Sequence, residues 1–445
     1  MFLQNKNKIK IAFYTLGCKV NQYETQALAE RFAALGFEVV GTDETSDVYI
    51  INSCTVTGIA DRKSRNYARR SKRANPDALT VLTGCYAELG ADSLKDVSEI
   101  DMLVGNGEKE KLPELIMGAI EARRGNSPGL GGDVSLDCGL PGDGNGEAYA
   151  GSGYARGVTG LADRARAYVK IEDGCNRRCS YCIVPSARGG VRSRELDDIV
   201  AEARALVANG YKELVLTGVN AALYGEVEGL GIIDVVDAVA KIDGDFRVRL
   251  SSLEPTVIDA SYAAELIKRE IVCPHLHLSL QSGSDAVLSA MNRGYTMHDY
   301  FRIVETLKSH DPLFSITTDI IAGFPGETEA DHAASLKAVR EVGFSRIHVF
   351  RYSRRPGTPA ADMPGQISSK VKAERSRALI AEGEKSANLF LRGNIGHWRR
   401  TLFYGSDGAG AYRGITANDI EVRVKSAEDL SNSFSYIRLE ESMYP

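Results

Sequence analysis

The sequence predicts an α/β protein with an N-terminal doubly wound parallel sheet, a central partial (β/α)6 barrel and a small C-terminal antiparallel β-barrel. Three observations support this fold class. Apolar runs of strand length alternate with amphipathic helical segments, a glycine-rich stretch interrupts them once, and the tail changes to short alternating strands. We place these parts at residues 1–124, 161–390 and 391–445, with a linker at 125–160.

The first part is predicted to begin with a strand, a helix and two further strands. Residues 9–15 form an apolar run typical of a buried strand, and residues 22–35 have the spacing of an amphipathic helix. Residues 48–51 and 80–83 are again apolar and of strand length. Strands that alternate with helices in this way indicate a parallel sheet covered on both faces.

The segment 125–160 breaks this alternation. Twelve of its 36 residues are glycine, and its apolar residues follow neither helical nor strand spacing. A glycine-rich composition without periodicity is typical of a flexible linker.

The alternation then resumes and gives six strand and helix units. We predict strands at residues 168–171, 213–216, 246–251, 276–280, 315–321 and 347–350. Helical patterns between them include residues 196–209, 257–268, 297–307 and 329–341. Six units indicate a curved parallel sheet that stays open on one side, because a full barrel needs eight, and its active site should lie at the carboxyl ends of the strands.

The tail follows a predicted helix at residues 368–391. Its short alternating stretches at residues 401–404, 420–424 and 435–439 are typical of a small antiparallel barrel.

Composition limits the classes of function. No apolar run approaches the roughly 20 residues that a membrane span needs, and the N-terminus lacks a secretory segment, so we expect a cytoplasmic protein without membrane contact. Thiols stay reduced in that compartment, and the eight cysteines are therefore read as metal ligands or reactive groups. A net charge of −5 argues against indiscriminate nucleic-acid binding, so any RNA contact must be local.

Three cysteines form a compact motif directly after the first predicted barrel strand. Cys175, Cys179 and Cys182 have C-x3-C-x2-C spacing, which suits three irons of a 4Fe-4S cluster and leaves the fourth iron without a protein ligand. An open iron can bind S-adenosylmethionine and deliver the electron that cleaves its carbon–sulfur bond. A structural zinc site is the weaker alternative, because such sites need four ligands and no Cys or His nearby completes this one.

Three further cysteines are dispersed but share a position. Cys18, Cys54 and Cys85 each follow a predicted strand of the first sheet closely, and parallel strands end at the same edge. The three thiols could hold a second open cluster there, or each could be a small buried hydrophobic residue. Cys138 in the linker and Cys273 in the barrel are interpreted as incidental.

These motifs together resemble the methylthiotransferases of the radical S-adenosylmethionine superfamily over nearly the whole chain. The matching signatures are Thr15-Leu16-Gly17-Cys18-Lys19-Val20-Asn21-Gln22-Tyr23-Glu24, Asn52-Ser53-Cys54-Thr55-Val56-Thr57, Thr83-Gly84-Cys85-Tyr86 and Asp173-Gly174-Cys175-Asn176. Lys19-Val20-Asn21 is similar to the branch that acts on N6-threonylcarbamoyladenosine next to the anticodon of transfer RNA. Other branches act on isopentenyladenosine in transfer RNA or on a ribosomal protein.

The resemblance implies two 4Fe-4S clusters, S-adenosylmethionine in two roles, and an electron donor such as flavodoxin or ferredoxin. One S-adenosylmethionine would methylate sulfur at the auxiliary cluster on Cys18, Cys54 and Cys85, and another would yield the radical at the Cys175 cluster. A radical is required because the target ring carbon is unactivated toward bases and nucleophiles.

Candidate contacts to S-adenosylmethionine lie at the predicted strand ends. Gly218 would allow close backbone approach, and Glu254 or Gln281 could bond the ribose or the methionine end. Each of these positions could equally serve a turn or a helix cap, but polar groups at four adjacent strand ends favour a site. The full predicted set is Tyr181, Gly218, Asn220, Ser251, Glu254, Gln281, Ile320 and Gly323.

Candidate RNA contacts are basic. One predicted set lies on the helix after Cys54 and comprises Arg62, Lys63, Arg65, Arg69 and Arg70, and a second follows the last barrel strand at Arg351, Arg354 and Arg355. Such a run of charged residues ordinarily indicates a solvent-exposed helix face. The tail resembles the RNA-binding TRAM domain around Tyr412 to Val424, yet from residue 395 onward seven acidic residues outnumber six basic ones. Shape or a few placed arginines would then have to provide its RNA affinity.

Two alternatives to the threonylcarbamoyladenosine reading stay open at this point. The enzyme could belong to the isopentenyladenosine or the ribosomal-protein branch. The chain could also be a non-catalytic, metal-dependent RNA-binding protein with zinc at its cysteines, which iron and sulfide analysis would distinguish.

Overall fold

The computed structural model describes residues 8–123, 165–406, 408 and 410–444. The described residues form two compact units, one made of 8–123 with Ile183–Gly189 and the other of 165–182 with 190–444. The predicted linker at 125–160 and Cys138 lie outside the described residues. The predicted domain boundaries remain predictions, although the first unit takes seven residues from the middle of the chain.

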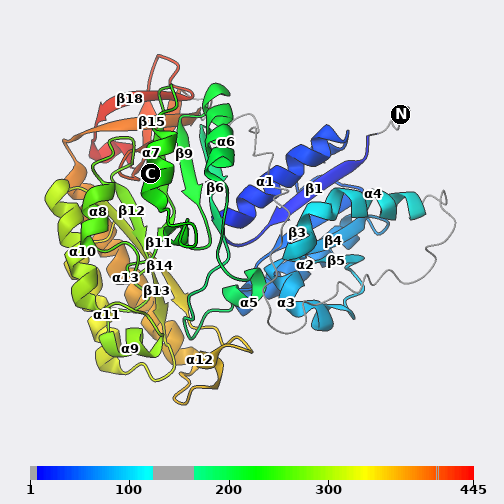
Figure 1. The fold of residues 1–445 in the computed structure, drawn as a ribbon, viewed down its shortest axis with the longest axis horizontal. Coiled ribbons are helices and arrows are strands. Elements are labelled where there is room, and N and C mark those ends of the chain that lie inside the picture. Colours follow the sequence, from blue (N-terminus) through cyan, green and yellow to red (C-terminus); the bar gives the residue numbers. More distant parts are fainter. Residues whose placement is uncertain (1–7, 124–164, 407, 409, 445) are drawn as a thin grey trace. The chain divides into compact units, whose positions relative to one another are not determined.

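The first unit contains a five-stranded parallel sheet with the order β2-β1-β3-β4-β5 (Figure 1). Its strands are β1 (Lys10–Thr15), β2 (Glu38–Val40), β3 (Val48–Ser53), β4 (Leu79–Gly84) and β5 (Met102–Val104). Its helices are α1 (Lys19–Ala34), α2 (Gly58–Ala74), α3 (Cys85–Leu94), α4 (Leu112–Arg123) and α5 (Val184–Arg188), with a 3-10 turn at Asn106–Lys111.

Two separate cores cover the faces of this sheet. Ile11 and Ile50 pack with Phe32 of α1 and with α4 on one face, whereas Tyr49 and Ile51 pack with α2 and α3 on the other. Residues next to each other in a strand point to opposite faces, so the unbroken apolar runs are what a sheet buried on both sides requires. The doubly wound fold is therefore confirmed.

The second unit contains the six predicted barrel strands, all in parallel pairs. Strands β6 (Arg166–Lys170), β9 (Glu213–Thr217) and β10 (Arg247–Leu250) form one sheet, and β11 (Ser252–Leu253), β12 (His275–Leu278), β13 (Ser315–Ala322) and β14 (Arg346–Arg351) form the next. Only Ser251 separates β10 from β11 in the chain. A short antiparallel pair, β7 (Glu172–Asp173) with β8 (Arg192–Ser193), follows the first strand.

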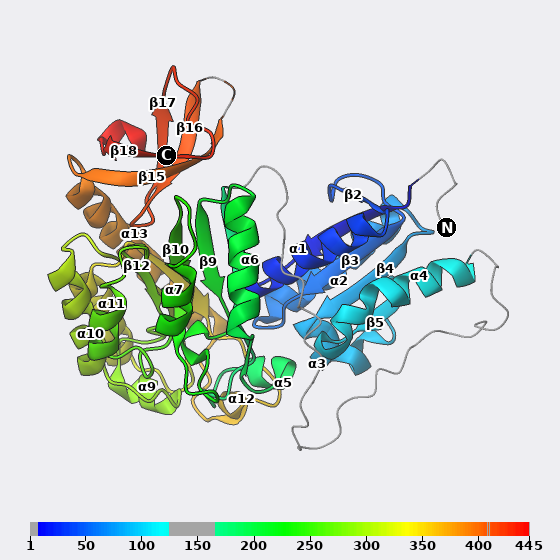
Figure 2. The ribbon, with the colours of Figure 1, turned by 45° about the horizontal axis from the view of Figure 1, so that its top comes forward.

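Helices lie on the outside of the barrel, between its strands and after the last of them (Figures 1 and 2). They are α6 (Leu196–Ala208), α7 (Ile232–Val239), α8 (Ala260–Leu266), α9 (Asp285–Ala290), α10 (Met297–His310), α11 (Glu329–Val342), α12 (Pro359–Asp362) and α13 (Ser369–Asn394). Local sequence explains their starts: α10 and α11 each begin with a capping box, made by Thr296 with Asp299 and by Thr328 with Asp331.

The tail forms a four-stranded antiparallel sheet with the order β17-β16-β15-β18. Its strands are β15 (Trp398–Ser406), β16 (Ala411–Thr416), β17 (Glu421–Lys425) and β18 (Ser433–Arg438). Strand β16 was not among the predicted strands. A Cβ on its Gly414 would lie 2.8 Å from the Thr401 side chain and 2.9 Å from Phe403, so the glycine permits close packing against β15.

A buried ion pair between Arg249 and Asp419, 3.4 Å apart, joins this sheet to the amino ends of the barrel strands. Glu213, the first residue of β9, accepts from Arg247 at 2.6 Å and from Arg249 at 2.8 Å, and Arg166 lies 2.7 Å away. Arg247 also donates to the carbonyl oxygen of Ile415 at 3.0 Å. The tail sheet therefore covers the end of the barrel at which the parallel strands begin, opposite to the end at which they finish (Figure 2).

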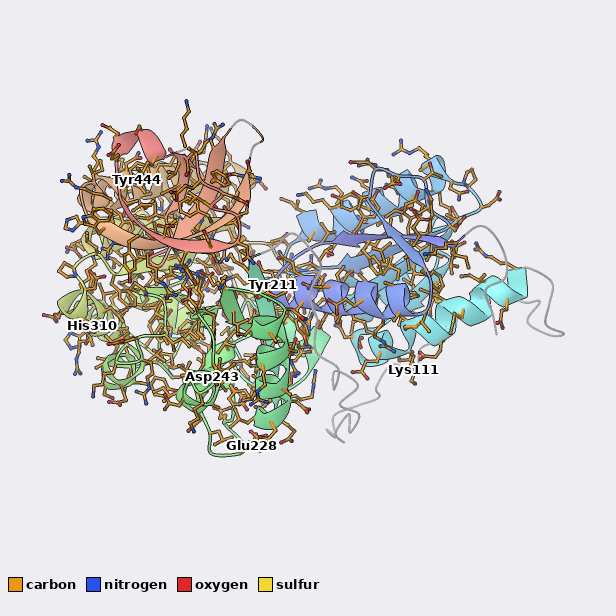
Figure 3. The ribbon with its side chains drawn as sticks, turned by 90° about the horizontal axis from the view of Figure 1, so that it is seen from above. Lys111, Tyr211, Glu228, Asp243, His310 and Tyr444 are labelled. Carbon is orange, nitrogen blue, oxygen red and sulfur yellow. The ribbon has the colours of Figure 1, made fainter. Side chains whose placement is uncertain are left out.

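The same amino-terminal side of the barrel carries a surface pocket of about 470 Å³. Tyr211 and Asp243 line it and precede β9 and β10 (Figure 3). None of the helices in the described parts of the chain is long and apolar enough to span a bilayer.

Candidate active site

Three cysteine loops meet at the carboxyl edge of the first sheet. Cys18 caps α1 after β1, Cys54 follows β3, and Cys85 begins α3 after β4. A Cβ on Gly17 would lie 2.7 Å from Cβ and 3.0 Å from Sγ of Cys54, so the first two loops are in contact. Strands β1 and β3 are neighbours at the point where the strand order reverses, which is where open α/β sheets bind ligands.

The exposure of these cysteines differs along the edge. Cys18 is exposed, Cys54 is half-buried and Cys85 is buried. Cys18 is exposed as a residue, while local burial of its thiol raises the pKa of that group, so Cys18 is not simply a hydrophobic side chain in the core. The helix α1 begins at Lys19, three residues before the predicted start, because the extended backbone of Cys18 forms its N-cap.

Asparagine side chains fasten the first two loops together. Asn21 donates to the carbonyl oxygen of Leu16 at 2.6 Å and to that of Ser53 at 2.9 Å. Asn52 in turn donates to the carbonyl oxygen of Asn21 at 3.0 Å. These bonds fix the residues on either side of Cys18 and directly before Cys54.

A buried charge cluster stands behind these loops, and we call it the Glu24 cluster. The carboxylate of Glu24 lies 2.6 Å from Nζ of Lys109 and 2.9 Å from a guanidinium nitrogen of Arg188. Each of the three side chains is at most 3% exposed. Sequence patterns missed Lys109 and Arg188, because they lie 85 and 164 residues from Glu24 in the chain.

Burial raises the pKa of the Cys54 thiol to about 12 and that of the Cys175 thiol to about 11. In the thiol form these groups cannot ligate iron, so a bound metal must replace their protons. The positive charge of Arg188 opposes the effect of burial on the pKa of Cys54.

The second cysteine group lies on one loop after β7. Arg293 donates to Sγ of Cys179 at 3.2 Å, and the backbone N–H of Arg177 donates to Sγ of Cys175 at 3.4 Å. The backbone after α9 holds the middle of the loop, where Ser180 donates to the carbonyl oxygen of Met291 at 3.0 Å. The loop thus presents Cys175, Cys179 and Cys182 from a supported backbone.

Glu254 connects this loop to the ends of the neighbouring strands. Its carboxylate lies 3.1 Å from Arg293 and 3.2 Å from Arg177, and it accepts from the side chain of Asn220 at 2.9 Å. Glu254 and Asn220 were predicted from the sequence, whereas Arg177 and Arg293 were not. Neither arginine stands out in a linear pattern, because the partner carboxylate is distant in sequence.

Glu172 is a fully buried carboxyl group beside the same strand ends. Its Oε2 accepts from the backbone N–H of Asn220 at 2.9 Å, and a Cβ on Gly218 would lie 2.4 Å from that oxygen. Burial raises the pKa of Glu172 to about 8, so the group is mainly protonated at neutral pH. Sequence analysis also missed this residue.

Several buried polar atoms at these strand ends lack a hydrogen-bond partner within the described chain. They are Oε1 of Glu172, Oγ1 of Thr217 and Oγ of Ser251. A buried polar atom without a partner is costly unless a ligand satisfies it. Unsatisfied polar atoms at these strand ends fit a site for S-adenosylmethionine, whose amino, carboxylate and ribose groups are polar.

The other predicted cofactor contacts have varied surroundings. Gln281 has a positive φ of 66° and exchanges backbone hydrogen bonds with Asp319 and Ile321, which places it beside the buried Ile320. Tyr181 packs against an apolar cluster that includes Phe324. A Cβ on Gly323 would lie 2.5 Å from the Lys372 side chain, so packing alone explains the absence of a side chain there.

Most of the predicted RNA-binding residues are exposed, and some of these also contact other side chains. On α2, Arg65 is half-buried and contacts the hydroxyl of Tyr86. Arg69 lies 3.4 Å from Glu99 and Arg70 lies 2.7 Å from Asp43, and both are exposed, as are Arg62 and Lys63. Near β14, Arg351 is exposed, Arg355 is half-buried and Arg354 lies 3.4 Å from Asp362.

The arrangement of thiols differs from a site for a single metal ion. No three His, Cys, Asp or Glu side chains in residues 8–123 and 165–444, apart from the two undescribed positions 407 and 409, are placed to hold one ion. Cluster ligands bind separate irons and need not converge on one point. Cys273 is 2% exposed and belongs to neither group of three cysteines.

Two regions of the chain match known protein families. Residues 169–339 match the radical SAM superfamily, and residues 10–105 match the uncharacterized protein family UPF0004. A relative from Thermotoga maritima, named threonylcarbamoyladenosine tRNA methylthiotransferase MtaB, is 40% identical over 87% of this chain and 85% of its own. A Bacillus subtilis protein of the same name is 35% identical over 98% of this chain and 94% of its own.

Solved structures support the fold. The radical S-adenosylmethionine methyltransferase TsrM from Kitasatospora setae aligns with a TM-score of 0.54 at 17% identity, over 80% of this chain and 75% of its own. This chain belongs to the methylthiotransferase family of the radical S-adenosylmethionine superfamily and is a transferase that works with two 4Fe-4S clusters and S-adenosylmethionine.

Proposed function

We propose that this enzyme adds a methylthio group to carbon 2 of N6-threonylcarbamoyladenosine next to the anticodon of transfer RNA. The observation that carries this proposal is the identity of 40% and 35% to two relatives named for that substrate, over most of each chain. Lys19-Val20-Asn21 after the first cysteine points to the same branch.

We assign the auxiliary cluster to Cys18, Cys54 and Cys85 and the radical-forming cluster to Cys175, Cys179 and Cys182. Cys175, Cys179 and Cys182 would hold the cluster that provides one electron to S-adenosylmethionine, and Cys18, Cys54 and Cys85 would hold the cluster that provides the sulfur. Arg293 holds Cys179 and Glu254 in place, and Glu254 and Asn220 offer polar groups to the cofactor. Glu172 keeps a proton that its Oε1 can donate, because Oε2 already accepts from Asn220.

The remaining proposed contacts are Tyr181, Gly218, Ser251, Gln281, Ile320 and Gly323 for S-adenosylmethionine. For RNA phosphates we propose the exposed Arg62, Lys63 and Arg351, supported by the paired or half-buried Arg65, Arg69, Arg70, Arg354 and Arg355. An electron donor such as flavodoxin or ferredoxin would reduce the clusters in the cytoplasm.

Mass spectrometry of nucleosides from transfer RNA, with and without the gene, tests the substrate. We expect 2-methylthio-N6-threonylcarbamoyladenosine to disappear in the deletion strain and to return with the wild-type gene. The Cys179→Ala variant should not restore it, because its open cluster lacks one ligand. Loss of the methylthio isopentenyladenosine nucleoside, or of a modified ribosomal protein alone, would assign the enzyme to another branch.

A further inference from the structure

The short helix α5 reaches all three cysteine loops of the first unit. Figures 1 and 2 show α5 beside α3, the helix that Cys85 begins. The carbonyl oxygen of Ala187 in α5 accepts from Asn106 at 2.8 Å, and the same amide group of Asn106 lies 3.8 Å from Sγ of Cys85. This is the contact of α5 with the third cysteine loop.

The next residue of α5 reaches the other two loops. Arg188 donates to Oδ1 of Asn21 at 2.6 Å. Asn21 is the residue that joins the backbone before Cys18 to the backbone before Cys54. The guanidinium group of Arg188 therefore orients the side chain of Asn21, whose hydrogen bonds join the first two cysteine loops.

The Glu24 cluster also adds charge at this edge. Glu24 accepts from Arg188 through both carboxylate oxygens, at 2.9 and 3.2 Å, and shares the second oxygen with Lys109 at 2.6 Å. Arg188 and Lys109 thus place two positive charges against one carboxylate, and all three side chains are almost completely buried. Charges buried away from solvent are weakly screened, so they interact strongly with nearby anions.

We infer that Arg188 is a positioning residue for the auxiliary cluster: it orients the Cys18 and Cys54 loops through Asn21 and supplies positive charge that stabilises an anionic cluster and its sulfur ligand. The inference rests on the proposed assignment of Cys18, Cys54 and Cys85 to that cluster. Arginine suits this place because its planar fork donates to both carboxylate oxygens of Glu24 and to Asn21 in one fixed geometry, whereas a lysine ammonium group is a single point charge on a flexible stem.

The test isolates the auxiliary site in the full chain. The parent variant carries Cys175→Ala, Cys179→Ala and Cys182→Ala, so that only the first group of thiols can hold a cluster. Arg188→Gln and Arg188→Lys are added to it, and each protein is reconstituted anaerobically with iron and sulfide. Iron per chain, iron retention against a chelator, and the reduction potential followed by electron paramagnetic resonance are then compared.

We expect Arg188→Gln to lose roughly 10- to 100-fold in iron retention, as for other residues that orient metal ligands. Its reduction potential should shift to a lower value, because the more negative reduced cluster loses a neighbouring positive charge. Arg188→Lys should restore most of the potential but not the retention, since it keeps the charge and loses the fork. If the Gln variant does not fold, the Lys variant still tests positioning through retention.

Lys111→Gln is the matched control. Its ammonium group lies on the same 3-10 turn as Lys109 but is 66% exposed, and Figure 3 shows it at the surface. It should leave potential and retention unchanged. A parent variant that binds no iron would overturn the cluster assignment and the inference together. A parent that binds iron, with equal potential and retention after Arg188→Gln, would overturn the inference alone.

Discussion

At the scale of single residues, Glu172 makes stability depend on pH. Its pKa rises on folding from 4.5 to about 8 because it is buried. The folded protein therefore holds a proton that the unfolded chain releases between these values, and stability falls as pH increases across that range, by up to about 1.4 kcal/mol per pH unit. We expect the thermal unfolding midpoint of the Glu172→Gln variant to lack this slope.

Thermal unfolding at intervals from pH 5 to pH 9, under anaerobic conditions, measures the effect. The exposed Glu228, labelled in Figure 3, provides the control substitution Glu228→Gln, which should follow the wild-type curve. Parallel curves for wild type and Glu172→Gln would contradict the assignment of a proton to Glu172.

A comparison of two buried cysteines tests the auxiliary site. Wild-type enzyme reconstituted without oxygen should hold about eight irons per chain, and Cys85→Ala should hold about four, because the second cluster loses one of its three ligands. Cys273→Ala should keep the wild-type content, since Cys273 is also buried but remote from both groups of thiols in the sequence. Iron and sulfide analysis decides the outcome, and equal losses in both variants would indicate a folding defect instead.

Site residues that lie at a short, regular spacing in the sequence could be predicted. Site residues whose roles depend on partners far along the chain could not. The spacing of Cys175, Cys179 and Cys182 is local, and the strand-end position of Cys18 is visible in hydrophobicity. Arg188 and Arg293 owe their roles to carboxylates 164 and 39 positions away. The periodicity of the sequence does not indicate such ion pairs between distant residues.

At the scale of elements, helix α2 offers a test of RNA contact. Replacing Arg62 and Lys63 by Gln removes two exposed positive charges from its surface. We expect weaker transfer RNA binding and a plot of log affinity against log salt that is less steep by about one unit per removed contact. Filter binding at several salt concentrations measures both quantities.

The control removes two charges elsewhere. Lys337 and Lys385 are 68% and 71% exposed on α11 and α13, and their replacement by Gln should leave the salt dependence unchanged. An equal effect from both pairs would show that only the net charge matters, and would remove α2 from the proposed RNA-binding surface.

Elements with strong periodicity were predicted well, and those without it were missed. The six barrel strands and the long α13 follow from apolar runs and helical spacing. Strands β2 and β5 have only three residues each, and the polar, glycine-containing β16 owes its place to pairing with β15 and β17. Pairing between distant segments is decided by tertiary contacts, which override local preference.

At the scale of the whole molecule, buried ion pairs hold the tail sheet on the barrel. Burial alone would raise the pKa of Glu213, but Arg249, Arg247 and Arg166 outweigh it and hold the pKa well below its usual value. Glu213→Ala would leave these guanidinium groups without their shared carboxylate, which costs about 3–5 kcal/mol for a buried pair. Chemical denaturation should therefore shift to lower denaturant concentration.

Limited proteolysis of the same variant should release fragments that begin near β15, because Arg247 would no longer be held in place to donate to the tail sheet. Glu265→Ala is the comparison, since Glu265 is 50% exposed on α8 and contacts surface cations. Equal resistance of both variants to denaturant and protease would show that the sheet is held by its apolar contacts alone.

The position of α5 in the chain has a consequence for biosynthesis. A ribosome makes Cys18, Cys54 and Cys85 long before it reaches Arg188, and it has already made Cys182 by then. The nascent N-terminal sheet therefore lacks α5 until the ribosome has passed Cys175, Cys179 and Cys182. Iron that bound the first three cysteines earlier would bind without the contacts of Arg188. Under the proposed assignment, maturation of the auxiliary cluster would therefore depend on a polypeptide that already carries the proposed ligands of both clusters.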